Sequence, residues 1–387
     1  MNICFVSGAY PPQHDGIADY TAQLAHALLK TNDSIRVSVI TSIVHVSQDT
    51  QGPPRIHRIV KKWNIFGIAA IIHCVLKEHF DIVHIQFPSV EYRKTFLFCI
   101  LPLLLRMSCH GIKVVLTLHE FSVSRPINKL RQFILSILSQ QVIVTDPYEY
   151  AQIVKLLPAA TAKVTIIPIG SNINTCMPNE NVRRVLLEQF GVNLQPFIVS
   201  FFGVIHPDKG FECLLRALAQ LVRDPIPVHV LAISDLDQAH NAYHAHIVRM
   251  IETLKVKAFI SITGYQTPEK VSQLLFISDI CVLTFVDGVS LRRGTLMAAL
   301  AHYKPIIATR ARSYVPDLLR DKENIILVPL NDCCQLAQAI ATLYRDSALR
   351  DKLSAGAASL AKEFSWETIA SSHRRVYNKI INGKTFK

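Results

Sequence analysis

The sequence predicts an α/β protein with two doubly wound, Rossmann-like domains that face a cleft. Apolar, β-branched runs of strand length alternate with segments of helical periodicity, and the alternation restarts after a polar stretch at 170–182. The length of 387 residues exceeds one ordinary core, and fits two domains of about 150–200 residues each. Ligands of such folds bind beyond the carboxyl ends of the strands, so the cleft is the expected site.

The first half of the chain contains six expected strands. Helices are expected at 17–30 and 65–79, and the apolar segment 95–107, which Pro102 interrupts, is a further helix candidate. Each strand is a short apolar run, as strands of a parallel sheet require. The expected strands lie at 3–6, 36–41, 81–87, 113–118, 142–145 and 164–168.

The second half repeats this pattern after a domain boundary. The boundary is the stretch 170–182, which contains turn formers and has no periodicity. Five strands are expected, at 197–203, 228–233, 259–263, 280–284 and 305–308. Helices are expected at 211–223, 243–254, 268–277 and 292–301.

The composition narrows the class of protein and its location. The longest apolar run, 95–105, has about half the length needed to cross a bilayer, and the N-terminus lacks the pattern of a secretory signal, so a cytoplasmic location is expected. The nine cysteines, mostly in apolar segments, are interpreted as reduced core residues. The net charge of +12 is divided evenly about residue 172 with no basic tail, so nucleic acid is not an expected partner.

Basic residues are nevertheless concentrated in two short stretches of the first half. Four lie within 55–62, and seven lie within 93–131, where Glu120 is the single acid. The second stretch surrounds the apolar segment 95–107, which is the composition of a surface that rests on anionic lipid. A solvated face beside a buried helix is the alternative interpretation.

A loop of unusual composition separates the first strand from the first helix. In GAYPPQHDGIADYT, residues 8–21, Pro11 and Pro12 stiffen the chain and Gly16 permits a tight turn where a side chain would obstruct a ligand. The N-terminal amides of the following helix suit an anion or a hydroxyl-rich ligand. An ordinary βα loop is the alternative.

Six segments of the chain, taken in order, resemble the glycosyltransferases of family 4, which are retaining sugar transferases with the GT-B fold. The first segment, YPPQHDGIADYTAQLAHAL, contains the loop just described. The others are DIVHIQF (81–87), VVLTLHEF (114–121), KVTIIPIGSNI (163–173), FFGVIHPDKGFECLLRAL (201–218) and GVSLRRGTLMAALAHYKPIIATR (288–310). One such segment is unspecific, but the ordered set covers most of the chain.

The resemblance implies both a domain arrangement and an activity. Residues 1–172 are expected to bind the acceptor, residues 173–365 the nucleotide sugar, and residues 366–387 to form a helix that crosses back to the first domain. The implied reaction transfers a hexose-type sugar, with retention, from a nucleotide-sugar donor to a lipid-linked or polysaccharide acceptor. No metal or other cofactor is implied, and the basic stretches add peripheral contact with the inner face of an anionic membrane.

The sequence departs from the family pattern where the donor diphosphate is held. The family places Arg after the glycine at position 203, but this chain has Val204, and only Lys209 and Gly210 match the G-R-x-x-x-x-K-G pattern. A cation there neutralises charge on the departing nucleotide, so its loss should be costly. His206 is a candidate for part of this role.

A second departure removes two carboxylates. Counting back from Pro305, the glutamates of the E-x7-E pattern are replaced by Ser290 and Ala298, and Asp287 is the nearest acid. Arg292 and Arg293 stand where the family has apolar residues, so we expect the helix start SLRRGT to hold the diphosphate through backbone amides and an arginine. Alternatively, both arginines face solvent or bind structural carboxylates.

His119 and its neighbours are the candidates in the first domain. His119 follows a buried strand and matches a family histidine that lies near the donor sugar, where an imidazole can hydrogen-bond a hydroxyl. A structural role is the alternative for His119 and the favoured one for His84, while Glu120 is either a site carboxylate or solvated. The residues predicted as catalytic are His119 and Lys209, and those predicted to bind the donor are Gly16, His206, Gly210, Asp287, Ser290, Arg292, Arg293, Gly294 and Thr295.

Three functions remain open from the sequence. Retaining transfer needs little from a protein base, because the leaving phosphate can take the acceptor's proton, and this suits a chain without paired carboxylates at hydrolase spacing or a Ser-His-Asp signature. A sugar-nucleotide epimerase of the same fold is the second possibility. A catalytically silent sugar-nucleotide-binding subunit is the third, because the family arginine and both glutamates are missing.

Overall fold

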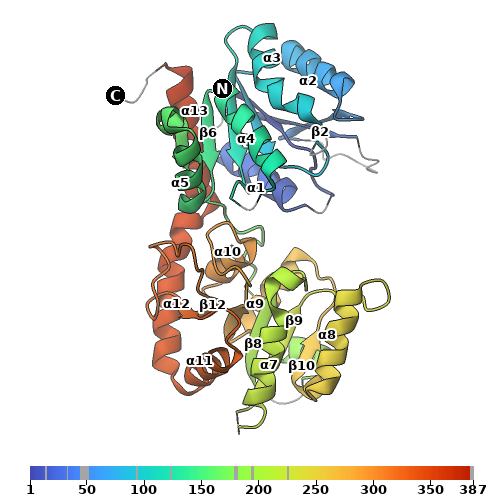
Figure 1. Cartoon of the computed structure of the whole chain (residues 1–387), viewed down its shortest axis with the longest axis vertical. Coiled ribbons are helices and arrows are strands. Elements are labelled where there is room, and N and C mark those ends of the chain that lie inside the picture. Colours follow the sequence, from blue (N-terminus) through green and yellow to red (C-terminus); the bar gives the residue numbers. More distant parts are fainter. Residues whose placement is uncertain are drawn as a thin grey trace. The chain divides into compact units, whose positions relative to one another are not determined.

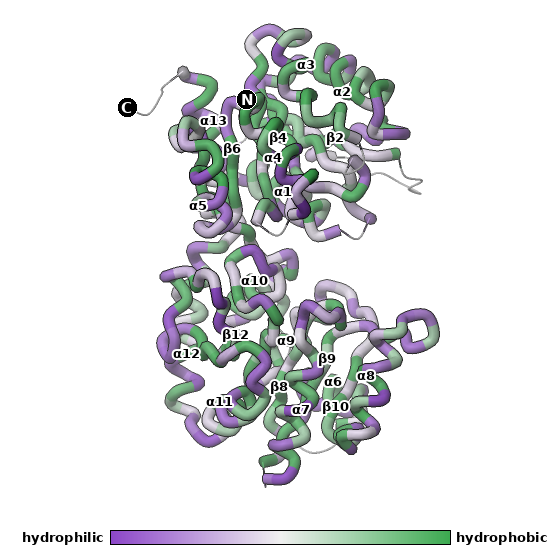
Figure 2. The backbone as a smooth tube through the Cα atoms, in the orientation of Figure 1, coloured by the Kyte–Doolittle hydropathy of each residue, from purple (hydrophilic) through white to green (hydrophobic). Residues whose placement is uncertain are grey.

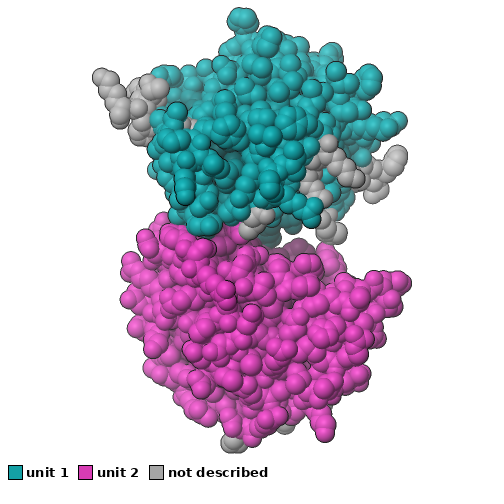
Figure 3. All heavy atoms as spheres, viewed as in Figure 1, with its two compact units in different colours: residues 1–172, 364–387 teal, residues 173–363 magenta. Residues whose placement is uncertain are grey.

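The computed structural model describes residues 1–13, 15–32, 34–43, 52–92, 95–122, 124–177, 182–192, 196–224 and 226–383. The chain forms two compact units (Figure 3), of which unit 1 comprises Met1–Asn172 with the C-terminal segment from Phe364, and unit 2 comprises Ile173–Glu363. Each unit contains one parallel sheet with helices on both faces (Figure 1). The predicted class, two doubly wound α/β domains, is therefore confirmed.

Unit 1 has a seven-stranded sheet in the order β3-β2-β1-β4-β5-β6-β7, in which every pair is parallel. The strand order reverses between β1 and β4, and the carboxyl edge at such a reversal is where open α/β sheets bind ligands. The strands are β1 (Asn2–Val6), β2 (Arg36–Ser42), β3 (Arg55–Val60), β4 (Ile82–Phe87), β5 (Lys113–Leu118), β6 (Gln141–Val144) and β7 (Val164–Ile166).

Helices from both ends of the chain cover one face of this sheet. There α1 (Gly16–Thr31) packs against α13 (Trp366–Ile381), with Asp15 and Ser365 accepting hydrogen bonds from the first-turn amides as N-caps. Their apolar faces join β1 and β2 in one buried cluster. The other elements outside the sheet are α2 (Ile65–Glu78), η1 (Phe96–Ile100), α3 (Leu101–Ser108), α4 (Pro126–Leu138), α5 (Pro147–Leu156) and η2 (Pro158–Lys163).

Unit 2 has a six-stranded parallel sheet in the order β10-β9-β8-β11-β12-β13. Its strand order reverses between β8 and β11, which places a second switch point there. The strands are β8 (Phe197–Phe202), β9 (Val228–Ile233), β10 (Ile260–Ile262), β11 (Ile280–Leu283), β12 (Ile306–Thr309) and β13 (Ile326–Val328).

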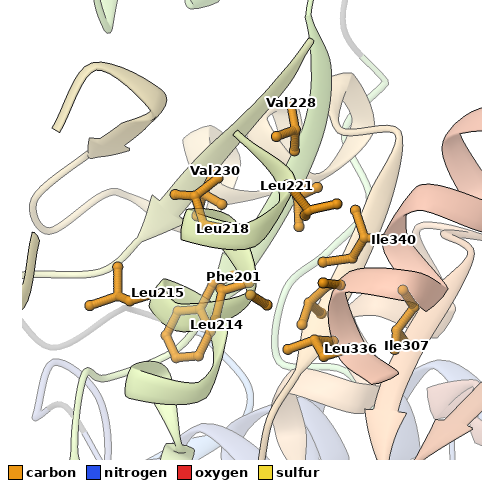
Figure 4. Close-up of a cluster of buried hydrophobic side chains, with 14 of the residues drawn as sticks. Phe201, Leu214, Leu215, Leu218, Leu221, Val228, Val230, Ile307, Leu336 and Ile340 are labelled. Atoms are coloured by element: carbon orange, nitrogen blue, oxygen red, sulfur yellow. The ribbon is translucent and has the colours of Figure 1, made fainter. Parts of the chain in front are cut away.

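Two apolar clusters hold the helices of unit 2 to the two faces of its sheet. Figure 4 shows the larger cluster, in which Leu214 and Leu218 of α7 and Ile340 of α11 pack with Phe201 and Ile307 of the sheet. The helices are α6 (Val182–Gln189), α7 (Phe211–Leu221), α8 (Ala242–Thr253), α9 (Pro268–Ile277), α10 (Gly294–Ala301), α11 (Cys333–Arg345) and α12 (Ser347–Ala361). Short 3-10 turns are η3 (Pro207–Lys209), η4 (Lys257–Phe259) and η5 (Lys362–Phe364).

Several elements differ from the sequence-based expectation. The strands β3 and β13 were not predicted, because β3 carries two arginines and β13 has only three residues at a sheet edge. The helix expected at 95–107 is a 3-10 turn followed by α3, with Pro102 in the first turn, where its missing N–H costs nothing. All nine cysteines are free, but Cys176 and Cys334 are exposed rather than part of a core.

Candidate functional site

Two loops meet at the carboxyl edge of unit 2, at its switch point. One follows β8 and carries residues 203–210, and the other follows β11 and carries residues 284–294. Thr284 Oγ1 donates to the carbonyl oxygen of Lys209 at 2.8 Å, and Val286 N donates to that of Asp208 at 3.1 Å. These two hydrogen bonds join the loop after β11 to the backbone of the loop after β8, so side chains of the two loops lie close together.

Glycine is required where these loops approach other backbone. Gly210 has a φ of +60°, and a Cβ there would lie 2.1 Å from the carbonyl oxygen of Thr284. Gly288 has a φ of +89°, and a Cβ there would lie 2.2 Å from the Cα of Ala311. Both positions therefore exclude a side chain, and the predicted site residue Gly210 serves to join the two loops.

Gly16 and Gly294, unlike Gly210 and Gly288, do not approach other backbone. Each begins a helix without a positive φ, and apart from the adjoining residues and the helix backbone, a Cβ at either position would meet no described atom within 4 Å. The expectation that Gly16 makes a tight turn is wrong, because Asp15 ends the loop instead by accepting hydrogen bonds from Ile17 N and Ala18 N at 2.9 and 3.0 Å. The open space beside both glycines leaves room for a ligand.

Three cations and two carboxylates form a cluster on the joined loops, called the switch-point cluster below. Lys209 Nζ lies 2.9 Å from Asp208 Oδ2, and Arg293 Nη1 lies 3.6 Å from the same oxygen. Arg293 also bonds Asp287 through Nη2, and Arg292 Nη2 lies 3.7 Å from Asp287 Oδ2. The cluster unites predicted residues from two segments that lie about 80 positions apart in the sequence.

The ring of Phe285 supports two of these cations. Arg293 Cζ lies 4.5 Å and Lys209 Nζ 5.4 Å from its centroid, and Phe285 is buried. A cation over an aromatic face gains electrostatic stabilisation and a fixed orientation. Arg293 Nε is buried with no hydrogen-bond partner among the described residues. Arg293 is therefore held in place while keeping donor capacity.

The carboxylates of the cluster are the more exposed members. The side chains of Asp208 and Asp287 are 40% and 44% exposed, against 15% for Arg293. Burial raises the pKa of Asp208, but hydrogen bonds from Lys209 and His206 outweigh it, and the net pKa lies below the usual range. His206 itself is mostly exposed and pairs with Asp208, so it contributes to the cluster through that carboxylate.

The first turn of α10 lies beside the two loops of the site. The helix begins at Gly294, two residues later than predicted, and Arg293 is its N-cap residue. Ser290 Oγ accepts from Arg292 Nε at 3.4 Å. A Cβ on Gly203 would lie 3.0 Å from Thr295 Cγ2, so the end of β8 and the first turn of α10 are in close approach.

Two of the three positions at which the family pattern has other residues, 204 and 298, differ in their surroundings. Val204 is 68% exposed, so no side chain covers the place where the family has arginine. Ala298 is fully buried in the apolar cluster that includes Ile198 and Leu274. A carboxylate at 298 would lie in apolar surroundings here, whereas a cation at 204 would be solvated.

His119 lies in unit 1, directly after β5. Its Nε2 is 2.9 Å from Gln86 Oε1, the ring of Tyr20 packs edge-on at 4.8 Å, and the residue is buried. No described residue bonds Nδ1 of His119. Burial, with a smaller contribution from His373, lowers the pKa of His119 to about 3, so the imidazole is neutral and Nδ1 can accept a hydrogen bond.

The other candidates of unit 1 take different roles. Both nitrogens of His84 are occupied, Nδ1 by Tyr377 Oη at 2.6 Å and Nε2 by Thr117 Oγ1 at 2.7 Å, which makes His84 structural as expected. Glu120 is exposed and its carbonyl oxygen accepts from Ser124. Glu120 therefore lies at the surface of the loop after β5.

Sequence reasoning missed four residues that shape these sites. Phe285 and Asp208 belong to the switch-point cluster, Ser234 bonds the loop after β8, and Gln86 bonds His119. Asp208 and Phe285 stand next to predicted residues or strands, so proximity could have indicated them. Ser234 and Gln86 act through contacts between separate strands, which no local pattern shows.

In the described part of the chain, no group of three or more His, Cys, Asp or Glu side chains is arranged to hold a metal ion. Nor does any described helix combine the length and apolarity that a bilayer-spanning segment needs.

Comparison with known families matches both halves of the chain. Residues 14–174 match the family described as Glycosyltransferase Family 4, and residues 196–346 match the family described as Glycosyl transferases group 1. The second match contains the whole switch-point cluster.

Two curated relatives that match part of this chain have the same name. The D-inositol 3-phosphate glycosyltransferase of Corynebacterium diphtheriae is 25% identical over 243 residues, which are 61% of this chain and 55% of that relative. Its counterpart in Corynebacterium glutamicum is 27% identical over 222 residues, 57% of this chain and 52% of the relative. The chain thus spans about half the length of the curated relatives that it matches.

Solved structures share the fold along nearly the whole chain. Sucrose-phosphate synthase from Thermosynechococcus elongatus has a TM-score of 0.73 at 20% identity and covers 99% of this chain and 100% of its own. Anabaena HepE, solved with UDP and glucose, has a TM-score of 0.76 at 17% identity, covering 98% and 100%. With its two parallel-sheet units and these matches, the chain belongs to the family 4 glycosyltransferases and has the GT-B fold.

Proposed function

We propose that this chain is a glycosyltransferase that moves a hexose, with retention, from a nucleotide sugar to a lipid-linked or saccharide acceptor. Unit 2 binds the donor and unit 1 binds the acceptor. The names of the relatives, D-inositol 3-phosphate glycosyltransferases, and the UDP and glucose in the HepE structure support a nucleotide-sugar reaction. No metal or other cofactor is part of the proposal.

The switch-point cluster is the observation that carries this proposal. It places Lys209, Arg292 and Arg293 at the carboxyl edge of a doubly wound sheet, beside the first turn of α10. Guanidinium and ammonium groups beside helix amides are suited to a diphosphate, which carries at least two negative charges. Since the family arginine is replaced by Val204, we assign its role to Arg293, which lies on Phe285 and whose buried Nε has no partner within the described part of the chain.

The reaction then needs little beyond charge stabilisation. The bond from the sugar carbon to the diphosphate breaks, positive charge develops on the carbon, and the diphosphate leaves with the electron pair. Lys209 and Arg293 stabilise the negative charge as it forms. The acceptor hydroxyl attacks from the same face and gives its proton to the leaving phosphate, so no protein base is required. His119, neutral and with Nδ1 free among described residues, is proposed to accept a hydrogen bond from a sugar hydroxyl.

A panel of donors tests the proposed function. Calorimetric titration with UDP-, GDP- and ADP-glucose identifies the donor, and incubation with and without a polyol phosphate or lipid acceptor then follows release of the nucleotide. Acceptor-dependent release with retained configuration is expected. Release without any acceptor or transfer product would favour an epimerase, and binding without release would favour a silent subunit.

Replacing Lys209 by alanine is expected to weaken donor binding or turnover by roughly 1.5–3 kcal/mol, because a charge-assisted contact to the diphosphate is lost. The fold should persist, since Lys209 lies in the short η3 turn and its ammonium group pairs with the part-exposed Asp208. Calorimetry and initial rates measure the effect. Lys257→Ala, which removes an exposed cation on η4 of the same unit, serves as the matched control. Equal donor affinity in both variants would remove Lys209 from the site.

We further propose that unit 1 rests on an anionic membrane surface. Exposed apolar side chains lie at the start of α2, where Phe66 is 79% exposed, and on α3, where Met107 is 71% exposed. These helices pack against each other, carry mainly apolar residues (Figure 2), and have Lys61, Lys62 and Arg106 exposed beside them. Apolar side chains flanked by cations are suited to an anionic interface.

Not every basic residue of this region contributes. Arg131 is buried and stacks 5.7 Å from the Phe96 ring, so it cannot contact lipid, and the predicted role of Arg93 and Lys94 lies outside the described residues. The membrane proposal is built on the exposed cations beside the apolar side chains of α2 and α3, which are Lys61, Lys62 and Arg106.

The protein is expected to co-sediment with anionic but not with neutral liposomes, and less so as the salt concentration rises, because screening weakens the attraction. Met107→Ser should reduce the bound fraction, while Tyr265→Ser, which removes an exposed aromatic residue from unit 2, should not. Equal binding to both kinds of liposome, or binding to neither, would overturn the proposal.

A further inference from the structure

Ile205, in the loop after β8, is held by two side chains from the segment that follows β9. Its N–H donates to Ser234 Oγ at 3.1 Å, and its carbonyl oxygen lies 2.8 Å from His244 Nε2. Ile205 is 1% exposed. Both of its backbone hydrogen-bonding groups are thus bound by side chains from elsewhere, and the position of the loop depends on those side chains.

His244, in the first turn of α8, connects two loops. Its Nδ1 accepts from the backbone N–H of Asp237 at 2.9 Å, while its Nε2 contacts Ile205 O. An amide N–H can only donate and a carbonyl can only accept, so the proton lies on Nε2 and the lone pair on Nδ1. Asn241 caps α8 by accepting from Tyr243 N and His244 N, which sets the direction of the ring. His244 is buried and lies outside the switch-point cluster.

The loop so held leads directly into the donor site. His206, the next residue, is the N-cap of the η3 turn that presents Asp208 and Lys209. The far end of this turn is bonded to Thr284 and Val286, as described above. His244 and Ser234 hold the near end, so the turn is fixed at both ends.

We propose that His244 is a positioning residue for the donor diphosphate, acting through Ile205 on the turn that carries Lys209. This inference rests on the proposed function, since it assigns a consequence to the site defined there. His244 touches no substrate, and its effect is expected in donor affinity and donor KM rather than in the rate at saturating donor. Small displacements of a binding group are costly because electrostatic contacts require defined geometry.

Two substitutions separate the contacts of His244. In His244→Phe the ring remains and both hydrogen bonds are lost, so affinity for the donor nucleotide should fall about tenfold, the effect of one to two lost hydrogen bonds. In His244→Gln a side-chain N–H still reaches towards Ile205 O, and most of the affinity should return. Ser234→Ala removes the other half of the clamp and should lower affinity in the same direction.

The matched control is His229→Phe. His229 is also buried in unit 2, but it bonds Ser261 Oγ at 2.9 Å near the amino end of β9, away from the site. This control is expected to lower the unfolding temperature without changing donor affinity. Affinities for UDP, GDP, ADP and inorganic pyrophosphate are measured by calorimetry well below the unfolding temperature of each variant.

Amide hydrogen exchange of residues 203–210 provides a second readout that needs no ligand. His244→Phe should speed exchange there relative to wild type and His229→Phe. If wild type binds no probe, the proposed function fails, while faster exchange in His244→Phe still supports the positioning contact. If wild type binds and His244→Phe binds equally well, or if exchange at 203–210 is unchanged, the positioning role is wrong.

Discussion

Arg293→Ala is expected to reduce donor turnover roughly a hundredfold, about 3 kcal/mol, the effect of removing one fixed donor from a developing oxyanion. Arg293→Lys should already be harmful, since an ammonium replaces neither the planar fork nor its stacking on Phe285. Arg293 bonds Asp287 and lies 3.6 Å from Asp208, so the donor must replace carboxylate contacts with phosphate contacts. The measurement is donor affinity and kcat/KM for each variant.

Arg292→Lys is the matched comparison. Arg292 is a similar cation at the next position, with Nε 3.4 Å from Ser290 Oγ and Nη2 3.7 Å from Asp287 Oδ2. Arg293, in contrast, contacts both carboxylates of the cluster and lies over Phe285. We expect a smaller effect than at Arg293. If Arg293→Lys keeps full donor affinity and turnover, the arginines are structural partners of the carboxylates and the assignment of the diphosphate site to Arg293 is wrong.

Acid is expected to destabilise unit 1 strongly between pH 6.5 and 5. Burial lowers the pKa of His119 to about 3 and of His373 to about 4, and the pKa of His84 lies well below its usual value, with His373 and His119 adding to the shift. In the unfolded chain each titrates near pH 6.5. As pH falls below that value the unfolded state binds protons that the folded state excludes, so stability present above pH 6.5 is lost.

At pH 5 the free energy of unfolding is expected to be lower by roughly 2 kcal/mol for each histidine, or about 6 kcal/mol for the three. Tryptophan fluorescence during urea unfolding reports it for unit 1, because Trp63 and Trp366 are the two tryptophans of the chain and both belong to that unit. His373→Gln should reduce the pH dependence by about one proton. His26→Gln, at an exposed position of α1, should leave it unchanged. A free energy of unfolding that is equal at pH 7 and pH 5 would contradict the neutral, buried state of these histidines.

These histidines also explain a limit of prediction from the sequence. His84 joins Tyr377 of α13, and His373 lies 3.3 Å from Tyr20 Oη, so the C-terminal helix is bonded to unit 1 by residues nearly 300 or more positions away. The family resemblance implied a helix over 366–387 that crosses back to the first domain, and the observed helix is Trp366–Ile381. Periodicity alone marks this segment as a helix without a partner, since partners depend on which faces the sheet leaves open.

Most strands were predictable because central strands of a parallel sheet are continuous apolar runs. Two edge strands were missed, β3, which mixes Arg55 and Arg58 with apolar residues, and β13, which has three residues, whereas the edge strands β7 and β10 were predicted. An edge strand pairs with one neighbour and is less buried than a central strand, so it needs fewer apolar residues. Its composition can therefore resemble that of a loop.

The candidate site was predictable in its members but not in its contacts. Lys209 was found because it matches the family's G-R-x-x-x-x-K-G pattern, and Arg293 because it stands where the family has an apolar residue. The role of Phe285 beneath them, and the choice between Arg292 and Arg293, depend on side-chain direction, which a sequence pattern does not contain. His244 was invisible for the same reason, since its contacts are two backbone groups in other loops.

A crystal structure of the protein with its donor nucleotide, chosen from UDP, GDP and ADP by calorimetry, tests the central claim most directly. The diphosphate is predicted to lie at the carboxyl edge of unit 2, with its oxygens within hydrogen-bond distance of Arg293 and Lys209 and beside the first turn of α10. At least one of the contacts from Arg293 to Asp208 or Asp287 should then be broken. A diphosphate bound elsewhere, with both carboxylate contacts intact, would contradict the account.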